Sequence, residues 1–173
     1  HQHFTPSLCP CDKTIEKAPL PDIISFGKKS QVCGILAGDR VLEAKNNVFQ
    51  RSSRINSTFG GNLTDMVRFK IILETIQEHN LLENAQIKGD YLLQKLHQLE
   101  EQFTAFMINS RGSGLFCSFD LPSSNERDLL TQEAYKNNLL ILGCGTKSIR
   151  FRPHLTVTEQ EIDFAIDGLE KSI

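Results

Sequence analysis

The stretch Asp22-Ile-Ile-Ser-Phe-Gly-Lys28-Lys-Ser-Gln-Val-Cys-Gly34 carries the strongest information about the fold. Its β-branched apolar run, residues 22–26, ends at a glycine and predicts a short buried strand. A second strand is expected over residues 32–37, where the next glycine stops it. The decisive position is Lys28, because it follows directly after the first strand and its glycine.

A lysine in this position suits covalent chemistry with a carbonyl compound. A lysine that forms a Schiff base needs a rigid mount and surroundings of low dielectric constant, which favour the neutral amine. The end of a buried strand supplies the mount, and Gly27 would let a bulky cofactor ring approach the backbone. The competing interpretation is a solvated lysine pair, Lys28 and Lys29, at a strand end.

Two long helices are expected further along the chain. Residues 64–79 carry apolar side chains on several faces, which predicts a buried helix. The next helix, over residues 81–103, has polar side chains opposite one apolar stripe and is expected to pack on a core by one face. This stripe consists of Leu82, Ala85, Leu92, Leu96, Leu99 and Phe103.

The last third of the chain alternates between short strands and helices. Capping-box spacings at Ser123–Glu126 and Thr158–Glu161 each predict the start of a helix, the first of which runs to about Asn137. The order strand, helix, strand, strand, helix indicates a small α/β layer domain. We therefore divide the chain into residues 1–80 and 81–173. The three strands are expected over residues 115–121, 139–142 and 148–151.

Composition excludes several classes of function. The formal net charge is −2, so there is no basic surface for nucleic acid. No apolar run reaches the ~20 residues of a membrane helix. Five scattered cysteines and the lack of a signal peptide indicate a reduced, cytoplasmic protein. The spacing of His1, His3, Cys9 and Cys11 is not that of a zinc site, so a surface loop and no metal are expected there.

Two further groups of residues could bind anions. Arg150 and Arg152 alternate around Phe151, so both guanidinium groups share one face of a strand and could hold a carboxylate. Hydroxyl groups and glycines in Asn56-Ser57-Thr58-Phe-Gly-Gly-Asn62 suit a phosphate at a helix entrance. The alternatives are two solvated arginines and an ordinary capped turn.

Taken in order, these motifs resemble the class III (ω-) aminotransferases, which use pyridoxal 5′-phosphate (PLP). The resemblance covers roughly residues 20–173 and is strongest to the lysine 6-aminotransferases, ahead of the 4-aminobutyrate enzymes. It is carried by Phe26–Gly34, Arg54–Arg68 and Ser148-Ile-Arg-Phe-Arg-Pro153. It implies the C-terminal portion of a PLP fold type I aminotransferase: residues 1–80 end the large PLP-binding domain, and residues 81–173 form the linking helix and the small C-terminal α/β domain.

The resemblance also implies roles for individual residues. Lys28 would be the catalytic lysine that bonds to PLP and moves the substrate proton. Thr58, with Ser57, would bind the cofactor phosphate, usually that of the partner subunit in a dimer. Arg150, rather than Arg152, would hold the substrate carboxylate. The family's N-terminal half, with its other PLP-binding groups, has no counterpart in this sequence, so the chain is expected to be a fragment that is inactive alone.

The reaction implied transfers the ε-amino group of L-lysine to 2-oxoglutarate and gives 2-aminoadipate 6-semialdehyde and glutamate. A homodimer with shared active sites is expected, with no nucleic-acid or membrane partner. One alternative is a transaminase of 4-aminobutyrate or another ω-amino acid, such as ornithine. An alternative of another class is an inactive truncated remnant that only dimerises.

Overall fold

The computed structural model describes residues 21–55 and 58–173, and the chain divides into two compact units, His1–Ile72 and Leu73–Ile173. In the first unit, strands β1 (Ile23–Phe26) and β2 (Gly34–Ala37) pair antiparallel, with Ile23 opposite Ala37. The two predicted strands are therefore confirmed. The other elements are the 3-10 turn η2 (Lys28–Ser30), α1 (Asp39–Glu43) and α2 (Leu63–Glu78), which continues into the second unit.

The expected burial of β1 and of α2 is wrong for this chain. No described residue between positions 21 and 72 is buried, and the side chains of Ile23 and Met66 are 55% and 49% exposed. A two-stranded ribbon has two open faces, and it needs a third strand or a packed helix layer to bury either of them. The apolar pattern correctly predicts a strand and a helix here. The described part of the first unit, however, does not provide enough surface to cover their apolar side chains.

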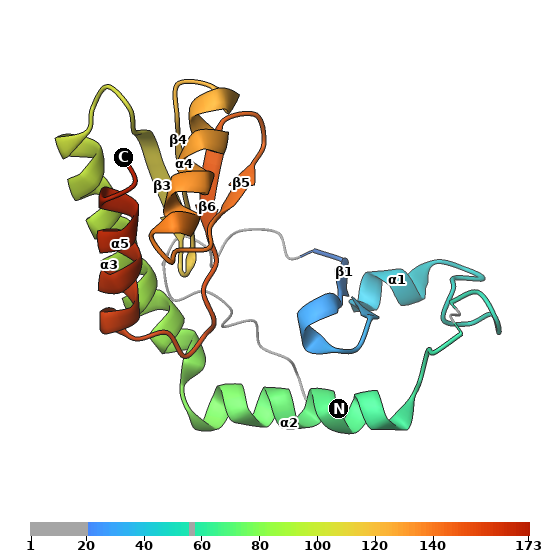
Figure 1. The fold of residues 1–173 in the computed structure, drawn as a ribbon. Coiled ribbons are helices and arrows are strands. Elements are labelled where there is room, and N and C mark those ends of the chain that lie inside the picture. The colour runs from blue at the N-terminus through green and yellow to red at the C-terminus, as the bar shows by residue number, and fades with distance from the viewer. Residues whose placement is uncertain (1–20, 56–57) are drawn as a thin grey trace. The chain divides into compact units, whose positions relative to one another are not determined.

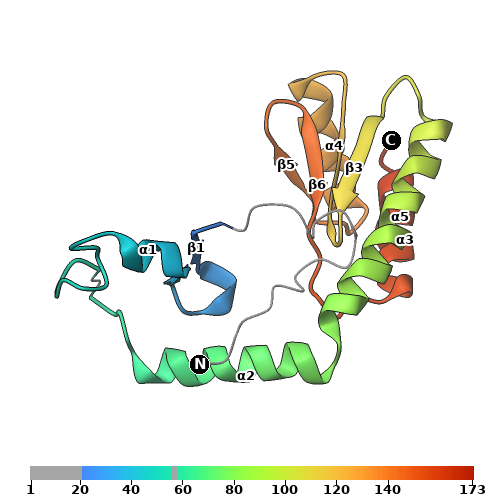
Figure 2. The same cartoon turned by 180° about the vertical axis from the view of Figure 1, so that it is seen from behind.

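The second unit is a two-layer α/β domain. Its four strands form one antiparallel sheet in the order β3-β4-β6-β5. Figures 1 and 2 show the helices of this unit gathered on one face of the sheet, and no helix of this unit covers the other, open face. The elements are α3 (Leu81–Gln102), β3 (Ile108–Ser113), β4 (Phe116–Asp120), α4 (Ser124–Lys136), β5 (Leu142–Cys144), β6 (Ser148–Phe151) and α5 (Glu159–Glu170).

The hydrophobic core lies between this sheet and its three helices. Alternate residues of β4 and β6 point into it, and the sheet residues Phe119 and Ile149 are fully buried. The helices contribute the apolar side chains that their periodicity predicts. The helical part of the core consists of Leu92, Leu96 and Leu99 from α3, Leu130 and Ala134 from α4, and Ile162, Ile166 and Leu169 from α5.

The predicted helix starts in the second unit are confirmed. The Thr158 hydroxyl accepts a hydrogen bond from the Glu161 amide at 3.3 Å, and the Glu161 carboxylate accepts one from the Thr158 amide at 2.8 Å, which completes a capping box. At α4 the Ser123 hydroxyl accepts from the Asn125 amide at 3.1 Å. In the described residues, no helix is both long enough and apolar enough to cross a membrane.

Three details of the sequence prediction differ from the structure. Strand β3 was not expected at all. Strand β5 begins at Leu142 rather than at Leu139. On α3, Leu82 is 54% exposed, whereas its neighbour Leu81 is 8% exposed and buried, so the apolar stripe starts one residue earlier.

Candidate functional site

The first candidate residue, Lys28, lies in the turn η2 directly after β1. Its side chain is exposed and has no ion-pair or hydrogen-bond partner among the described residues. Its backbone is left-handed, with φ of 62°, and Gln31 at the end of the turn has φ of 63°. The Gln31 amide closes the turn by donating to the Lys28 carbonyl at 3.1 Å. The backbone of Lys28 is therefore fixed, while its amino group is open to a ligand.

A side-chain network ties this turn to α2. Arg68 Nη1 lies 3.0 Å from Asp65 Oδ1 on the same helix and donates to Gln31 Oε1 at 3.4 Å. Gln31 in turn points its Nε2 at the Lys28 carbonyl, at 3.4 Å. All these groups are exposed or half-buried, so each contact adds little stability. Together they link the turn to α2.

Gly27 is required by packing against Cys33, whereas its position in the sequence indicates a role in cofactor access. A Cβ at Gly27 would lie 2.8 Å from Cys33 Sγ and 3.5 Å from Cys33 Cα. The backbone at Gly27 is extended, with φ of 172°, so the requirement is space rather than conformation. The glycine lets β1 and the segment before β2 close around η2. Access for a cofactor ring is not needed to explain it.

The second candidate segment precedes α2. Thr58 is exposed, and Ser57 and Asn56 lie outside the described residues. The Asn62 side chain accepts a hydrogen bond from the Thr64 amide at 2.9 Å, so the capping interpretation is correct for Asn62. Gly61 is left-handed, with φ of 77°, a conformation that favours glycine.

The structure brings this glycine segment next to the strand that follows the Lys28 turn. Cys33, Gly60 and Gly61 line two adjoining hollows of the first unit. Lys28 and Thr58 do not themselves line either hollow, but each precedes a lining segment within the same unit. The glycine segment and the segment that follows the Lys28 turn are therefore neighbours within the first unit.

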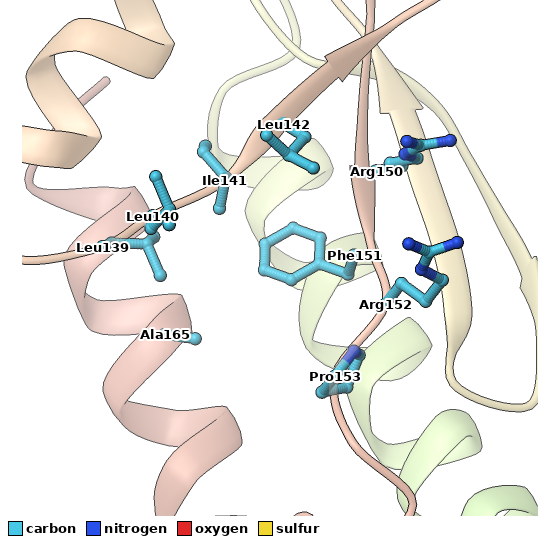
Figure 3. Close-up of a pocket in the computed structure, with 9 residues that line it drawn as sticks. All are labelled: Leu139, Leu140, Ile141, Leu142, Arg150, Phe151, Arg152, Pro153 and Ala165. Carbon is cyan, nitrogen blue, oxygen red and sulfur yellow. The ribbon is translucent and has the colours of Figure 1, made fainter. Parts of the chain in front are cut away.

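The third candidate, Arg150, lies on β6 in the second unit. It faces away from the core and is half-buried, opposite Ser118 of β4 and Leu142 of β5. Among the described residues, neither Arg150 nor Arg152 has a hydrogen-bond or ion-pair partner for its side chain. Figure 3 shows both guanidinium groups on one side of β6 and Phe151 on the other. The sequence prediction of a shared face is confirmed.

A hollow of about 250 Å³ lies beside these arginines, and its walls are mainly apolar. Figure 3 shows Phe151 extending toward the segment before β5 and the two guanidinium groups extending away from it. An anion would therefore contact the arginine side of β6 rather than the apolar side of the hollow. The lining residues are Leu139, Leu140, Ile141, Leu142, Arg150, Phe151, Arg152, Pro153 and Ala165.

Asp120, at the end of β4, belongs to the same open face and was not found by sequence reasoning. Its carboxylate accepts hydrogen bonds from Ser148 Oγ at 2.6 Å and from Asn109 Nδ2 at 2.9 Å, and it pairs with Arg111 Nη2 at 3.0 Å. Burial alone would raise the pKa of Asp120, but these hydrogen bonds and the charge of Arg111 together hold the pKa below its ordinary value. An aspartate near a strand end gives no signal until its cross-strand partners are known.

This lowered pKa makes the second unit sensitive to acid. A carboxyl group with a depressed folded-state pKa stabilises the fold above its unfolded pKa of about 3.9, and the contribution is lost as the pH falls through the folded value. Between about pH 5 and pH 3, we expect the unfolding free energy to fall less in Asp120→Asn than in the unchanged chain. Urea unfolding across this range measures it, with Asp167→Asn as an exposed control. Equal pH slopes for Asp120→Asn and the unchanged chain would contradict this expectation.

Comparison with known proteins decides what these residues belong to. The family model for class-III aminotransferases matches residues 14–173. The chain belongs to the class-III aminotransferase family. Within this family it is 47% identical over 154 residues to an L-lysine-epsilon aminotransferase of Amycolatopsis lactamdurans. It is 35% identical over 166 residues to a 4-aminobutyrate aminotransferase of Kluyveromyces lactis.

Solved class-III aminotransferase structures agree with the fold. The structure of a lysine aminotransferase from M. tuberculosis superposes with a TM-score of 0.85 at 47% identity, over 89% of this chain and 35% of that chain. The match to the Amycolatopsis protein covers 88% of this chain and 34% of the relative. The expected α/β fold and family are therefore confirmed, and the chain spans about a third of the length of these relatives.

Class-III aminotransferases depend on PLP, and the residues present fit part of such a site. Lys28 offers an exposed amine on a fixed turn, and Thr58 offers a hydroxyl next to a glycine segment in the same unit. The surroundings of low dielectric constant expected around Lys28 are not found among the described residues of this unit, none of which is buried. In these residues there is also no cluster of His, Cys, Asp and Glu able to hold a metal ion. His1, His3, Cys9 and Cys11 lie outside the described part.

Proposed function

We propose that the chain carries part of the active site of a PLP-dependent aminotransferase that moves the ε-amino group of L-lysine to 2-oxoglutarate. The products would be 2-aminoadipate 6-semialdehyde and glutamate. The observation that carries this proposal is the identity of 47% to L-lysine-epsilon aminotransferases, against 35% to a 4-aminobutyrate aminotransferase. Residues 1–80 would belong to the large domain of the enzyme and residues 81–173 to its linking helix and small domain, in a cytoplasmic homodimer.

Four residues would share the work. PLP, when bound, withdraws electrons from the carbon that carries the amino group. Lys28 would hold PLP through its Nζ and transfer the substrate proton, because its amine has no partner among the described residues and its backbone is fixed. Thr58 and Ser57 would hold the cofactor phosphate by their hydroxyl groups. Arg150 would orient the carboxylate of the amino acid or of the oxo acid by paired hydrogen bonds.

The role of Arg150 can be tested by binding alone. Replacing one partner of a charge-assisted hydrogen bond costs about 1.5–3 kcal/mol. We therefore expect Arg150→Gln to weaken binding of 2-oxoglutarate by about tenfold or more, as measured by isothermal titration calorimetry. Arg152→Gln is the matched control, because it removes the same charge from the same face of the strand. A larger loss with Arg152→Gln would move the carboxylate site to that residue.

The amino donor is tested by turnover. Because the chain alone is expected to be inactive, the test uses the full-length aminotransferase to which it would belong. Supplied with PLP and 2-oxoglutarate, that enzyme should form more glutamate from L-lysine than from 4-aminobutyrate or ornithine. A preference for 4-aminobutyrate would favour the alternative that the family also contains.

A second candidate is a non-catalytic chain that only dimerises. The absence of buried residues among the described part of the first unit favours it, because exposed apolar side chains stabilise association. This candidate predicts no covalently bound PLP at any concentration of the cofactor, whereas the aminotransferase proposal predicts attachment at Lys28.

A further inference from the structure

The open face of the sheet in the second unit places two arginines in one row across the strands. Arg111 of β3 lies opposite Ser118 of β4, and Ser118 lies opposite Arg150 of β6. Residues that face each other in an antiparallel sheet share one side of it, so both guanidinium groups start from the open face. Their backbones are two strand spacings apart, roughly 10 Å. Both arginines are therefore within reach of one small dicarboxylate.

The two arginines differ in what they contact. Arg111 Nη2 pairs with Asp120 Oδ1 at 3.0 Å, and Arg111 Nη1 donates to the Asn109 carbonyl at 2.7 Å. The side chain of Arg150 has no partner within the described residues. One cation of the row is thus neutralised inside the sheet, and the other is open to a ligand.

Asp120 is placed to influence both arginines. It lies opposite Ser148, two residues from Arg150 on β6, so it is a diagonal neighbour at roughly 7–8 Å. Its side chain is only 13% exposed. Ser148 and Arg111 use one carboxylate oxygen, and Asn109 uses the other. With both oxygens engaged, Asp120 is directed toward Arg111 and not toward Arg150.

We propose that Asp120 is a positioning residue that sets the specificity of the carboxylate site by holding Arg111 out of it. This inference rests on the proposed role of Arg150. An amino donor or oxo acid reacts only when it is bound in one position. A face with two unpaired arginines would let a dicarboxylate bind in a second, unproductive position. Neutralisation of Arg111 confines the anion to Arg150.

Charge variants separate this role from a purely structural one. The full chain is titrated with 2-oxoglutarate by calorimetry at low ionic strength, where screening is weak. Asp120→Asn releases Arg111, so the dissociation constant should fall by about two- to fivefold. Arg111→Gln leaves the Asp120 carboxylate without its cationic partner, diagonally across from Arg150, so the constant should rise by a similar factor. The double variant should return to within about twofold of the unchanged chain.

The sign of the two single effects decides the question. If Asp120 only ties the strands together, both single substitutions loosen the sheet and both weaken binding, which overturns the proposal. Arg111→Lys, which keeps the charge, is the matched control and should leave the constant within about twofold. If Asp120→Asn does not fold, as judged by circular dichroism, Arg111→Gln against Arg111→Lys still decides: equal constants overturn the proposal.

Failure of the underlying carboxylate site has its own signature. If Arg150→Gln binds 2-oxoglutarate as tightly as the unchanged chain, the proposed role of Arg150 is wrong. If Arg150→Gln loses binding but the two single variants shift the constant in the same direction, only the inference on Asp120 is wrong.

Discussion

Gly89→Ala is expected to destabilise the second unit by about 3 kcal/mol or more, although alanine is the better helix former. Gly89 lies in the middle of α3, where alanine would ordinarily gain about 1 kcal/mol. A Cβ at this position, however, would lie 2.2 Å from the carbonyl carbon and oxygen of Gly114 and 2.6 Å from its Cα. These are backbone atoms of the turn between β3 and β4, so no side-chain rotation relieves the overlap.

Gly114 itself cannot move easily, because it is left-handed, with φ of 52°, and contacts the helix closely. The close contact between α3 and this turn therefore depends on a glycine on each side, Gly89 and Gly114. Urea unfolding followed by far-ultraviolet circular dichroism measures the loss. Gln94→Ala, an exposed substitution on the same helix, should change stability by no more than about 0.5 kcal/mol. Equal stabilities for Gly89→Ala and the unchanged chain would refute the close packing described above.

Lys28→Ala is expected to abolish covalent attachment of PLP. The amino group of Lys28 is exposed and unpaired among the described residues, and its backbone is held by the Gln31 amide. Alanine at the same left-handed φ costs no more than lysine, so the turn should persist. The visible absorption that follows addition of PLP to the unchanged chain should be lost in this variant.

Lys29→Ala is the matched control for the same measurement, since it removes a lysine at the adjacent position. Its visible absorption should match that of the unchanged chain. Loss of the band with Lys29→Ala but not with Lys28→Ala would show that Lys29 holds PLP and that the assignment to Lys28 is wrong.

The regular elements of the second unit were largely predictable because their local signals agree with their packing. The capping pairs at Ser123 and Thr158 mark helix starts by hydrogen bonds within four residues, which needs no tertiary information. Strand β3 was missed because its sequence, Ile108-Asn-Ser-Arg-Gly-Ser113, has a serine at the buried position and no apolar alternation. It becomes a strand by pairing with β4.

The start of β5 shows a different limit. Leu139 and Ile141 are buried and apolar, as a strand requires, but the Leu139 amide donates to the Ala134 carbonyl at 2.8 Å. Asn138 is left-handed, with φ of 62°, and turns the chain at the end of α4. The backbone of Leu139 therefore completes the helix terminus, and strand pairing starts only at Leu142.

The positions of the candidate residues in the secondary structure could be predicted from the sequence. The surroundings of their side chains could not. Lys28 and Arg150 were found from their position after a strand and within a strand, and Arg150 does share its face with Arg152. The apolar strand pattern predicts low-dielectric surroundings for Lys28, but the side chain is exposed, as in the alternative of a solvated lysine. The pattern predicts burial without showing what covers the strand. Asp120 was not found, because its partners Asn109 and Ser148 are eleven and twenty-eight residues away.

Chemical trapping shows directly whether Lys28 is the residue that holds PLP. The chain is incubated with PLP, reduced with borohydride, digested and analysed by peptide mass spectrometry. We expect the phosphopyridoxyl group mainly on Lys28. A label spread over the exposed lysines, or concentrated on Lys29, would contradict it.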